Sequence, residues 1–288
     1  MTVDAITSTR NPRVRALAGL GSARTRREQG RHLLEGPNAV AEALAAGVVE
    51  ELLVLADTGS VRAKVPPGVH VTQVAPHVLD RLADTTTPQG VLAVCRTPQA
   101  TLEEVVGTGV LVVLHAVADP GNAGTILRTA DAAGAAGVVL TEGSVDPYGP
   151  KALRAAAGST YHLPVVTGVA LPSLLAACRA RGQRVVGLDG SAATSAFVLE
   201  DDAAPVALVL GNEAHGLPAE VAGSLDGTVA VPRYGRAESL NVAAAAAIAI
   251  YAAARGRAAH RTAPGPVPVP SAAPVAGGAP ASGRRGGG

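Results

Sequence analysis

The chain has 288 residues, of which 48% are hydrophobic, and a formal net charge of +1. That length allows one large domain or two modest ones with packed cores. Because aromatic residues make up only 2% of the chain, those cores must be built from Ala, Val and Leu. The two cysteines, Cys95 and Cys178, lie far apart in apolar surroundings and show neither metal-ligand nor CxxC spacing. They predict core thiols in a reducing compartment and no metal site.

Basic side chains are concentrated near the N-terminus, although the overall charge is close to neutral. Between residues 1 and 32, seven arginines stand against two acidic residues. Such an excess can neutralise phosphates, but a solvated helix face would give the same pattern. The candidates for contacts to a nucleic-acid backbone are Arg10, Arg24, Arg26, Arg27 and Arg31.

The sequence predicts a protein without membrane spans. Its N-terminus lacks the apolar core of a signal peptide. The longest apolar stretch, residues 242–254, is shorter than the roughly 20 residues that a helix needs to cross a bilayer. We therefore expect a cytoplasmic protein.

The first 98 residues alternate helical and strand-like patterns. Residues 31–46 have helical spacing, whereas residues 51–56, 69–74 and 90–95 look like short strands. A polar stretch at residues 96–99 follows the last of these strands. We therefore predict a small N-terminal α/β domain over residues 1–98 and a linker over residues 99–108.

From residue 109 the pattern becomes regular, and apolar strands alternate with helices. The expected strands are residues 111–117, 137–140, 184–188, 206–210 and 228–231. The expected helices are residues 123–135, 151–157, 171–181, 218–225 and 241–255. This alternation predicts a parallel sheet covered on both faces, an α/β fold over residues 109–257 that binds ligands at the carboxyl ends of its strands. Residues 258–288 are rich in Pro, Ala and Gly and predict a disordered tail.

Three polar loops follow predicted strands, and the first begins at Asp119. Pro120-Gly121 indicates a turn, and Asn122 is a good N-cap for the helix that follows. Helical side chains lean toward the N-terminus, so we expect Arg128 to reach back over Gly124, which has no side chain to block it. A guanidinium in that position suits a phosphate or a ribose oxygen.

The second and third loops carry Glu213 and the Ser239-Leu240-Asn241 segment. Glu213 comes directly off a buried strand, where a carboxylate is costly unless it is paired, and Arg128 is its expected partner. Gly211 would let a ligand approach the backbone closely. Ser239 or Asn241 must cap the final helix, and one cap suffices. The second polar group is therefore available for another task.

In these loops the chain resembles the SpoU (TrmH-like) family of RNA ribose 2′-O-methyltransferases, part of the SPOUT superfamily. The resemblance spans residues 111–255 and depends on three ordered motifs. These are Asp119-Pro-Gly-Asn-Ala-Gly with Arg128, Leu210-Gly-Asn-Glu213 with Gly216-Leu217, and Val231-Pro232 with Glu238-Ser-Leu-Asn-Val242. The N-terminal part resembles the family's ribosomal-protein-like substrate-binding domain through Asn11-Pro12, Leu34-Glu35-Gly36 and residues 90–94.

The resemblance implies a C-terminal trefoil knot, a homodimer that completes each site, and methylation of an RNA ribose 2′-hydroxyl. It implies S-adenosylmethionine as cofactor, with cofactor contacts at Leu210, Gly211, Val231, Pro232 and Leu240. It also implies that the catalytic and substrate-positioning residues are Asn122, Arg128, Glu213, Ser239 and Asn241. Because a guanidinium stays protonated at neutral pH, we favour a clamping role for Arg128 over the role of base.

Three alternatives remain open at this level. Ribosomal RNA is favoured over transfer RNA as the substrate, by analogy with ribosomal RNA-binding modules. An RNA-binding protein of the same fold without catalysis is a rival, as is a nucleotide-dependent dehydrogenase, which would need a fingerprint loop that this sequence lacks. Arg233, which stands where family members often have Met, could alter substrate or dimer contacts.

Overall fold

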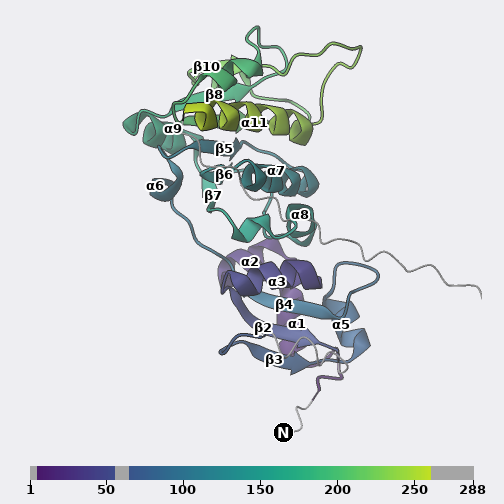
Figure 1. The fold of residues 1–288 in the computed structure, drawn as a ribbon. Coiled ribbons are helices and arrows are strands. Elements are labelled where there is room, and N and C mark those ends of the chain that lie inside the picture. Colours follow the sequence, from purple (N-terminus) through teal and green to yellow (C-terminus); the bar gives the residue numbers. More distant parts are fainter. Residues whose placement is uncertain (1–4, 56–64, 261–288) are drawn as a thin grey trace, which may run out of the picture.

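The structure is a computed structural model that describes residues 5–55 and 65–260, and in it the chain forms two sheets (Figure 1). The first sheet has four strands in the order β1-β4-β2-β3. Its central strand β4 runs antiparallel to β1 and β2, and β3 runs parallel to β2. The strands are β1 (Arg31–Glu35), β2 (Val49–Val54), β3 (His70–Gln73) and β4 (Val91–Arg96). The predicted tail and the end of the strand predicted at residues 51–56 lie outside the described residues.

Helices cover both faces of this small sheet. On one face α3 buries Val40 and Ala43 against the strands. On the other face α1 and α5 bury Val14 and Leu79. The helical segments of this part are α1 (Pro12–Ala18), η1 (Gly19–Gly21), α2 (Ala23–Gln29), α3 (Pro37–Ala45) and α5 (Pro76–Leu82).

The helix predicted over residues 31–46 is wrong in its first third, which forms β1. Gly36 takes a φ of 97°, and Pro37 then opens α3 at its first turn, so the chain reverses between the two elements. In β1, His32 and Leu34 are buried while their neighbours are less covered. This alternation of buried and less covered residues indicates a strand, but in the sequence it adjoins residues with helical spacing and was included in the predicted helix.

The second sheet has six strands in the order β10-β8-β9-β5-β6-β7, and all its pairs are parallel. The predicted parallel α/β fold is therefore confirmed. The strands are β5 (Val110–Leu114), β6 (Gly137–Thr141), β7 (Val165–Val169), β8 (Arg184–Leu188), β9 (Val206–Leu210) and β10 (Gly227–Val229). The sequence did not predict β7, an edge strand in which only Val165 and Val166 are buried.

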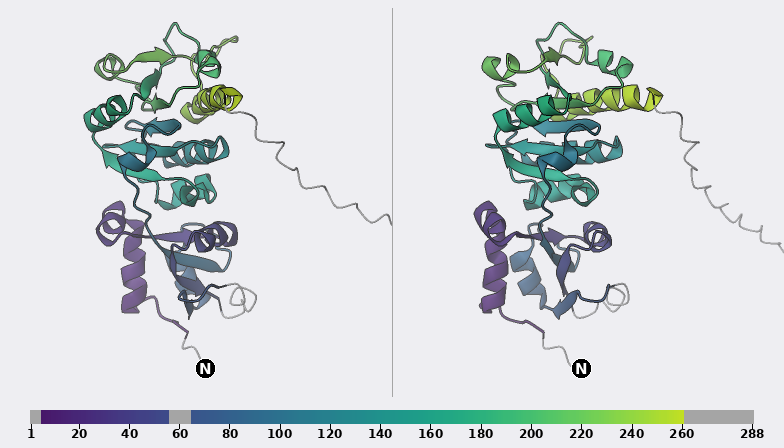
Figure 2. Two further views of the ribbon diagram at one scale, coloured as in Figure 1. Left: turned by 60° about the vertical axis from the view of Figure 1, so that its left-hand side comes forward. Right: turned by 90° about the vertical axis from the view of Figure 1, so that its left-hand side faces the viewer.

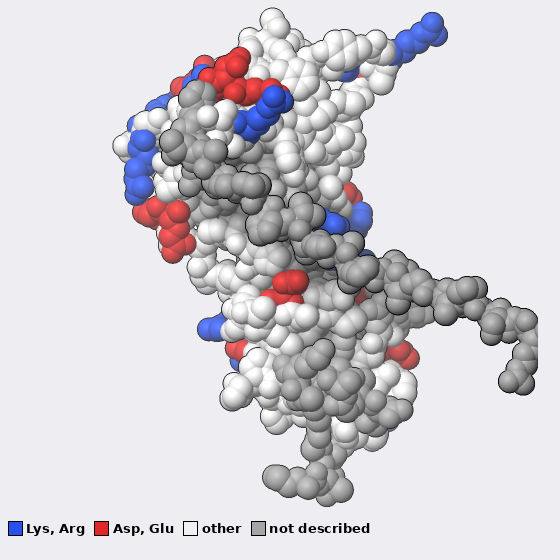
Figure 3. Space-filling model, in the orientation of Figure 1, with Lys and Arg blue, Asp and Glu red and all other residues white. Residues whose placement is uncertain are grey.

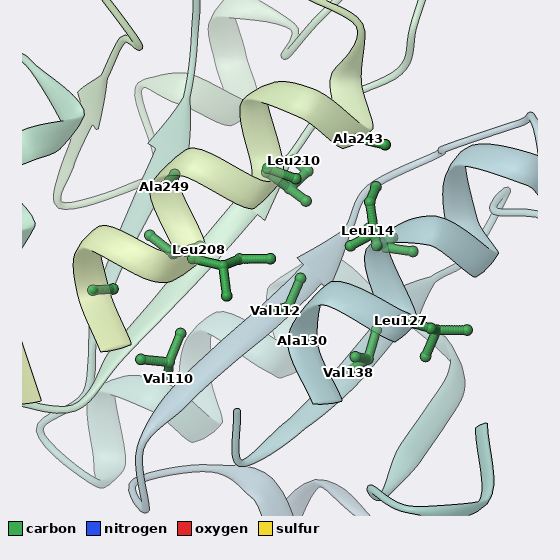
Figure 4. Close-up of a cluster of buried hydrophobic side chains, with 14 of the residues drawn as sticks. Val110, Val112, Leu114, Leu127, Ala130, Val138, Leu208, Leu210, Ala243 and Ala249 are labelled. Carbon is green, nitrogen blue, oxygen red and sulfur yellow. The ribbon is translucent and has the colours of Figure 1, made fainter. Parts of the chain in front are cut away.

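Two layers of helices enclose the large sheet (Figure 2). The side chains of Val112 and Leu208 contribute to a core under α7 and α11 (Figure 4). Leu111 and Val113 alternate with them and point into a second core beneath α9. The helical segments are α6 (Leu102–Val105), α7 (Pro120–Ala132), α8 (Pro150–Ala156), η2 (Ser159–Tyr161), α9 (Leu171–Ala180), η3 (Ala196–Asp201), α10 (Ala219–Ala222) and α11 (Val242–His260).

Helix α6 lies in the range predicted as a linker. Its Val105 and the adjoining Val106 are fully or almost fully buried in the core beneath α9. Thr101 caps this helix in a capping box with Glu104. The segment is thus packed onto the large sheet and does not pass freely between the two domains.

The final helix α11 is longer than the apolar stretch suggested. Residues 242–259 have a mean hydropathy of 1.2, so this helix is long and apolar enough to cross a membrane by length and composition alone. The expectation that the stretch is too short is therefore wrong, because the helix continues past Arg255. Ala246, Ala249 and Ile250 are fully buried against the sheet. A core helix of this kind passes the same test.

Both cysteines are buried and free, which confirms them as core thiols. Burial raises the pKa of Cys95 to about 12 and that of Cys178 to about 11. Both side chains therefore remain protonated at neutral pH.

A polar seam joins the two parts of the chain. The Arg26 guanidinium of α2 donates to Asp146 of the large domain, with Nε 2.8 Å and Nη2 2.7 Å from Oδ2. Buried His32 lies 2.8 Å from the Tyr161 hydroxyl through Nε2, and its ring centroid is 5.1 Å from that of Tyr148. Burial and the nearby Arg26 charge lower the pKa of His32 to about 3, so the ring is neutral. These contacts fix one domain against the other.

Candidate functional site

The three predicted loops meet at the carboxyl ends of the strands of the large sheet, beside the neighbouring central strands β5 and β9. The order of the strands reverses here, because β6 and β7 lie beyond β5 while β8 and β10 lie beyond β9. Such a switch point leaves a crevice at the carboxyl ends of parallel strands. The first loop follows β5 and the second follows β9, so both open into this crevice.

Asp119, and not Asn122, caps helix α7. The Asp119 carboxylate accepts the Asn122 backbone N–H at 2.8 Å, which places Asn122 one turn further along with its side chain free to act elsewhere. The predicted N-cap is therefore wrong, because Pro120 takes the first helical position and moves the cap one residue before it. Lys151, which the sequence did not single out, forms a 2.7 Å ion pair with Asp119. The Lys151 hydrogen bond and the Asn122 amide lower the pKa of this carboxyl.

A chain of side-chain hydrogen bonds links all three loops. Asn122 Nδ2 donates to Glu213 Oε1 at 3.1 Å, and Asn241 Nδ2 donates to Asn122 Oδ1 at 3.1 Å. The amide of Asn122 thus uses both of its ends, one toward the second loop and one toward the third. The predicted convergence of the three loops is present in the structure as this chain.

The expected pairing of Glu213 with Arg128 is wrong. Glu213 is exposed, and it accepts the backbone N–H groups of Ala118 and Asp119 at 3.1 and 3.0 Å, in addition to the Asn122 side chain. Desolvation raises the pKa of this carboxyl, but these hydrogen bonds together outweigh it and hold the pKa below its usual value. Glu213 is therefore an ionised brace for the first loop.

Arg128 lies on the exposed face of α7. Within residues 5–55 and 65–260 the guanidinium has neither a hydrogen bond nor an ion pair. The predicted route over Gly124 is also wrong, because α8 fills that space. A Cβ on Gly124 would come within 2.3 Å of the Ala152 carbonyl oxygen. Gly124 therefore serves the close packing of α7 against α8.

Asn241 is the cap of α11, because its Oδ1 accepts the backbone N–H groups of Ala243 and Ala244 at 2.8 and 3.3 Å. Ser239 is exposed two residues earlier. The two polar residues of the third loop thus divide into a cap that also binds Asn122 and a second hydroxyl beside it. The same loop is anchored at its start by Arg233, which donates to the Gly190 carbonyl oxygen at 3.0 Å.

A pocket of about 320 Å³ lies between the second and third loops. Leu210, Gly211, Val231 and Leu240, four of the five residues predicted to contact the cofactor, line it, while Pro232 does not. Glu213 and Ser239 lie in its wall. The polar parts of a ligand would therefore contact the polar residues of the wall, and its apolar parts would contact Leu, Val and Ala.

Gly211 is required by the loop itself as well as by any ligand. A Cβ on this residue would lie 2.3 Å from the backbone of Gly216. The approach results from Asn212 and Gly216, which exchange backbone hydrogen bonds of 3.1 and 2.8 Å and close the loop. Asn212 also donates to the Ala116 carbonyl oxygen at 2.9 Å, a bridge between the first two loops that the sequence did not reveal.

The predicted nucleic-acid arginines are in different environments. Arg26 is buried, so the structure removes it from the candidates for phosphate contacts. Its guanidinium is occupied by Asp146 and by the carbonyl oxygens of Leu20 and Gly21. The other four are exposed, and two of them form ion pairs, Arg24 with Glu28 and Arg31 with Glu50. On the face shown in Figure 3, basic and acidic side chains are interspersed, without a continuous basic field.

The fold and the site together define a two-domain α/β enzyme with its ligand pocket at the switch point of the larger sheet. Residues 109–251 match the SpoU rRNA Methylase family, and residues 11–93 match the MRM3-like substrate binding domain. The chain is 37% identical over 249 residues to the 23S rRNA (guanosine(2553)-2'-O)-methyltransferase RlmP of Bacillus subtilis (strain 168). That match covers 85% of this chain and 97% of the relative. The chain belongs to the SpoU rRNA methylase family.

Solved structures agree with this assignment. The AdoMet-bound rRNA methyltransferase from Sinorhizobium meliloti superimposes with a TM-score of 0.79 at 32% identity, over 88% of this chain and 97% of that one. The SpoU methyltransferase AviRb from Streptomyces viridochromogenes, in complex with AdoMet, gives a TM-score of 0.78 at 30% identity, over 86% and 98% of the two chains. The predicted family, methyltransferase activity on an RNA ribose 2′-hydroxyl and S-adenosylmethionine cofactor are confirmed.

Proposed function

We propose that this S-adenosylmethionine-dependent RNA methyltransferase modifies a ribose in ribosomal RNA, and that Asn122, Arg128, Glu213, Ser239 and Asn241 form the methyl-transfer site. The observation that carries the proposal is the hydrogen-bonded chain that starts at Glu213, a residue lining the pocket, and runs through Asn122 to Asn241. It fixes the three loops at the place where a ribose and a methyl donor must meet. Relatives that act on 23S rRNA and the match of the N-terminal part to a substrate binding domain support ribosomal RNA.

The pocket suits the cofactor by size and by chemistry. Its volume of about 320 Å³ lies within the range of roughly 300–1,000 Å³ that small-molecule sites occupy. When bound, S-adenosylmethionine supplies a methyl group on a positively charged sulfonium. The ionised carboxylate of Glu213 in the wall offers a favourable charge to such a cation. Leu210, Val231 and Leu240 supply apolar contacts and backbone groups around it.

The side chains have separate tasks in this proposal. Arg128 is exposed and has no partner among the residues that the structure describes, so it clamps a phosphate or ribose oxygen and orients the 2′-hydroxyl for in-line attack. Asn122 and Asn241 hold the loops in register, and Glu213 braces the first loop from below. The Ser239 hydroxyl, exposed at the pocket wall, contacts the sugar. Because methyl transfer removes the cofactor's charge and releases a proton from the 2′-hydroxyl, positioning and desolvation are the main requirements.

The test is incubation of the purified protein with methyl-labelled S-adenosylmethionine and either 23S rRNA or total tRNA, followed by primer extension to locate ribose-methyl stops. We expect label in 23S rRNA only. Label in tRNA alone would redirect the substrate, and RNA binding without label would indicate a protein that has lost catalysis.

Substitution of Arg128 sharpens this test. Arg128→Ala should abolish methyl transfer and leave the affinity for S-adenosylmethionine, measured calorimetrically, within about twofold of the wild type, because this residue does not line the cofactor pocket. Arg81→Ala, an exposed substitution on α5 away from the three loops, serves as control. Wild-type turnover by the Arg128 variant would refute its assignment.

We extend the proposal to the architecture that the family implies. Residues 1–98 form the substrate-binding domain and residues 109–257 the methyltransferase domain, and the latter carries a trefoil knot. The return of the chain from edge strand β10 to α11, packed over β5 and β9, supports the knot. Exposed Phe197 and Val198 on η3, which packs against α11 with its exposed Tyr251, support a homodimer. We propose a cytoplasmic enzyme that does not span a membrane, because α11 is a core helix.

A further inference from the structure

A second cavity, of about 520 Å³, lies between the two domains. Helix α2 borders it from the N-terminal domain, and the carboxyl ends of β6 and β7 border it from the large domain. Figure 1 shows α2 at the end of the N-terminal domain that meets the large one. The lining is mainly polar and includes the residues Arg27, Gln99, Glu142 and Thr167. We call this cavity the interdomain cleft.

Hydrogen bonds connect the wall of the interdomain cleft to the end of β5, the strand that leads into the first loop of the proposed methyl-transfer site. Its wall contains the segment that follows β6, and Ser144 Oγ donates to the Leu114 carbonyl oxygen at 2.9 Å. The Val145 backbone N–H donates to the carbonyl oxygen of Val117, two residues before the first loop, at 2.9 Å. Because all strands of the large sheet are parallel, the ends of β5 and β6 lie on the same edge. The interdomain cleft and the first loop therefore open at the same edge of the large sheet.

The three arginines of α2 differ in a way that the sequence could not show. Arg26 is buried against Asp146 and holds the two walls of the interdomain cleft together. Arg24 pairs with Glu28 on the outer surface and does not line the cavity. Arg27 is exposed and lines the cavity, and in the described part of the chain it has no ion-pair partner. It is the cation on α2 that is free to meet a phosphate inside the cleft.

We propose that the interdomain cleft binds the single-stranded RNA that flanks the methylated nucleotide, with Arg27 contacting its phosphate backbone. The inference rests on the proposed function, since it places more of the same substrate. Glu142 would repel a phosphate, so the bases and their N–H donors face this carboxylate while the backbone faces α2. The separation between the walls is set by Arg26–Asp146 and His32–Tyr161, so the cleft is preformed.

The test compares steady-state kinetics of variants on in-vitro-transcribed 23S rRNA. Arg27→Ala should raise the KM for RNA about tenfold, leave kcat and the KM for S-adenosylmethionine within twofold, and reduce the salt slope of binding by about one. Arg24→Ala, on the same helix but outside the cleft, should have less than a third of that effect. Arg15→Ala, an exposed arginine on α1, is the neutral control. Equal effects of Arg24→Ala and Arg27→Ala would place the RNA over the outer surface of α2 and overturn the proposal.

A charge pair at one position provides an independent measurement. Thr167 is exposed on edge strand β7 and lines the cavity, so both Glu and Lys are tolerated by the fold there. Thr167→Glu should raise the KM for RNA at least threefold and Thr167→Lys should lower it. Shifts of the same sign, or none, would refute RNA in the cleft. If the wild-type protein does not methylate 23S rRNA, the proposed function fails first; if it does and these variants are silent, only the present inference fails.

Discussion

Asn241 and Asn122 are separated by 119 positions in the chain, yet their side-chain amides are joined by a hydrogen bond of 3.1 Å. Asn241 also caps α11 through its other amide atom. One side chain therefore ties helix α11 to the first of the three loops. The position of α11 and the position of Asn122 are coupled through this contact.

That coupling can be separated from the cap. Asn241→Asp keeps the Oδ1 acceptor at the helix N-terminus but replaces the donor to Asn122 with a second acceptor. We expect the melting temperature to stay near that of the wild type and kcat to fall by up to about 100-fold, since a small misplacement of catalytic groups has effects of that size. Asn241→Ser, a cap that is also too short to reach Asn122, should lose activity in the same way. A fully active Asn241→Asp variant would show that the contact is incidental.

The buried ion pair between Arg26 and Asp146 should make a large contribution to stability. Their side chains are only 7% and 17% exposed, so removing one partner leaves a charge without compensation. Arg26→Ala is expected to cost about 3–5 kcal/mol. Arg24→Ala, which breaks the exposed pair with Glu28 on the same helix, should cost less than about 1 kcal/mol. Urea unfolding measures both, and equal losses would contradict the assigned role of Arg26.

His162 makes the domain seam sensitive to pH. Its ring lies 2.8 Å from Asp131 of α7 and 3.2 Å from Glu42 of α3. The Asp131 hydrogen bond raises the pKa of His162 above 6.5, against a smaller opposing effect of burial, and Glu42 adds to the increase. Because the pKa of His162 is higher in the folded state, the protonated ring stabilises the fold fully below a pH of about 6.5. This stabilisation is lost as the pH rises through the pKa of His162 in the folded protein.

The excess melting temperature of the wild type over His162→Gln should therefore shrink as pH rises from about 6 to about 8. Differential scanning at several pH values measures it. Because His162 is 40% exposed, the effect should also weaken in high salt. A difference that grows with pH would refute the assignment.

Gly124→Ala should destabilise the large domain by about 1–3 kcal/mol, because the added Cβ meets the Ala152 carbonyl oxygen at 2.3 Å and Ala155 Cβ at 2.6 Å. Helix α7 begins within the first loop, so a shift of α7 away from α8 would also displace Asp119 and Asn122. Gly235→Ala is a matched control, since its Cβ would have no atom within 4 Å. Thermal unfolding distinguishes the two, and equal melting temperatures would show that α8 yields without cost.

The large sheet could be predicted because its strands are continuous apolar runs, and the bounds expected for β8 and β9 agree with the structure. The meeting of the three loops followed from the same sheet. Their partners did not follow. Glu213 binds loop amides instead of Arg128, and Gly124 faces α8, because such contacts depend on how distant elements pack.

The arginines show the same limit. A run of arginines has the same sequence pattern whether its side chains are solvated or buried. Arg26 is buried because Asp146, 120 residues later, accepts hydrogen bonds from its guanidinium. The strand β1 was missed for a local reason, since five residues of alternating burial adjoin a longer helical pattern. Edge strand β7 was missed because only two of its five residues are buried, which leaves no continuous apolar run.

Tyr148 and Leu153 belong to the large domain in sequence, yet both are buried within the core of the small one. In a chimera that exchanges the first 98 residues for those of a relative, the core of the new N-terminal domain would therefore pack against Tyr148 and Leu153 of this chain, which it does not match. Grafts that transfer the segment between β6 and η2 together with the N-terminal domain should fold. Exchange at the sequence boundary alone should leave a cavity or a steric clash in the core of the small domain. The unit that can be transplanted in this protein is discontinuous along the chain.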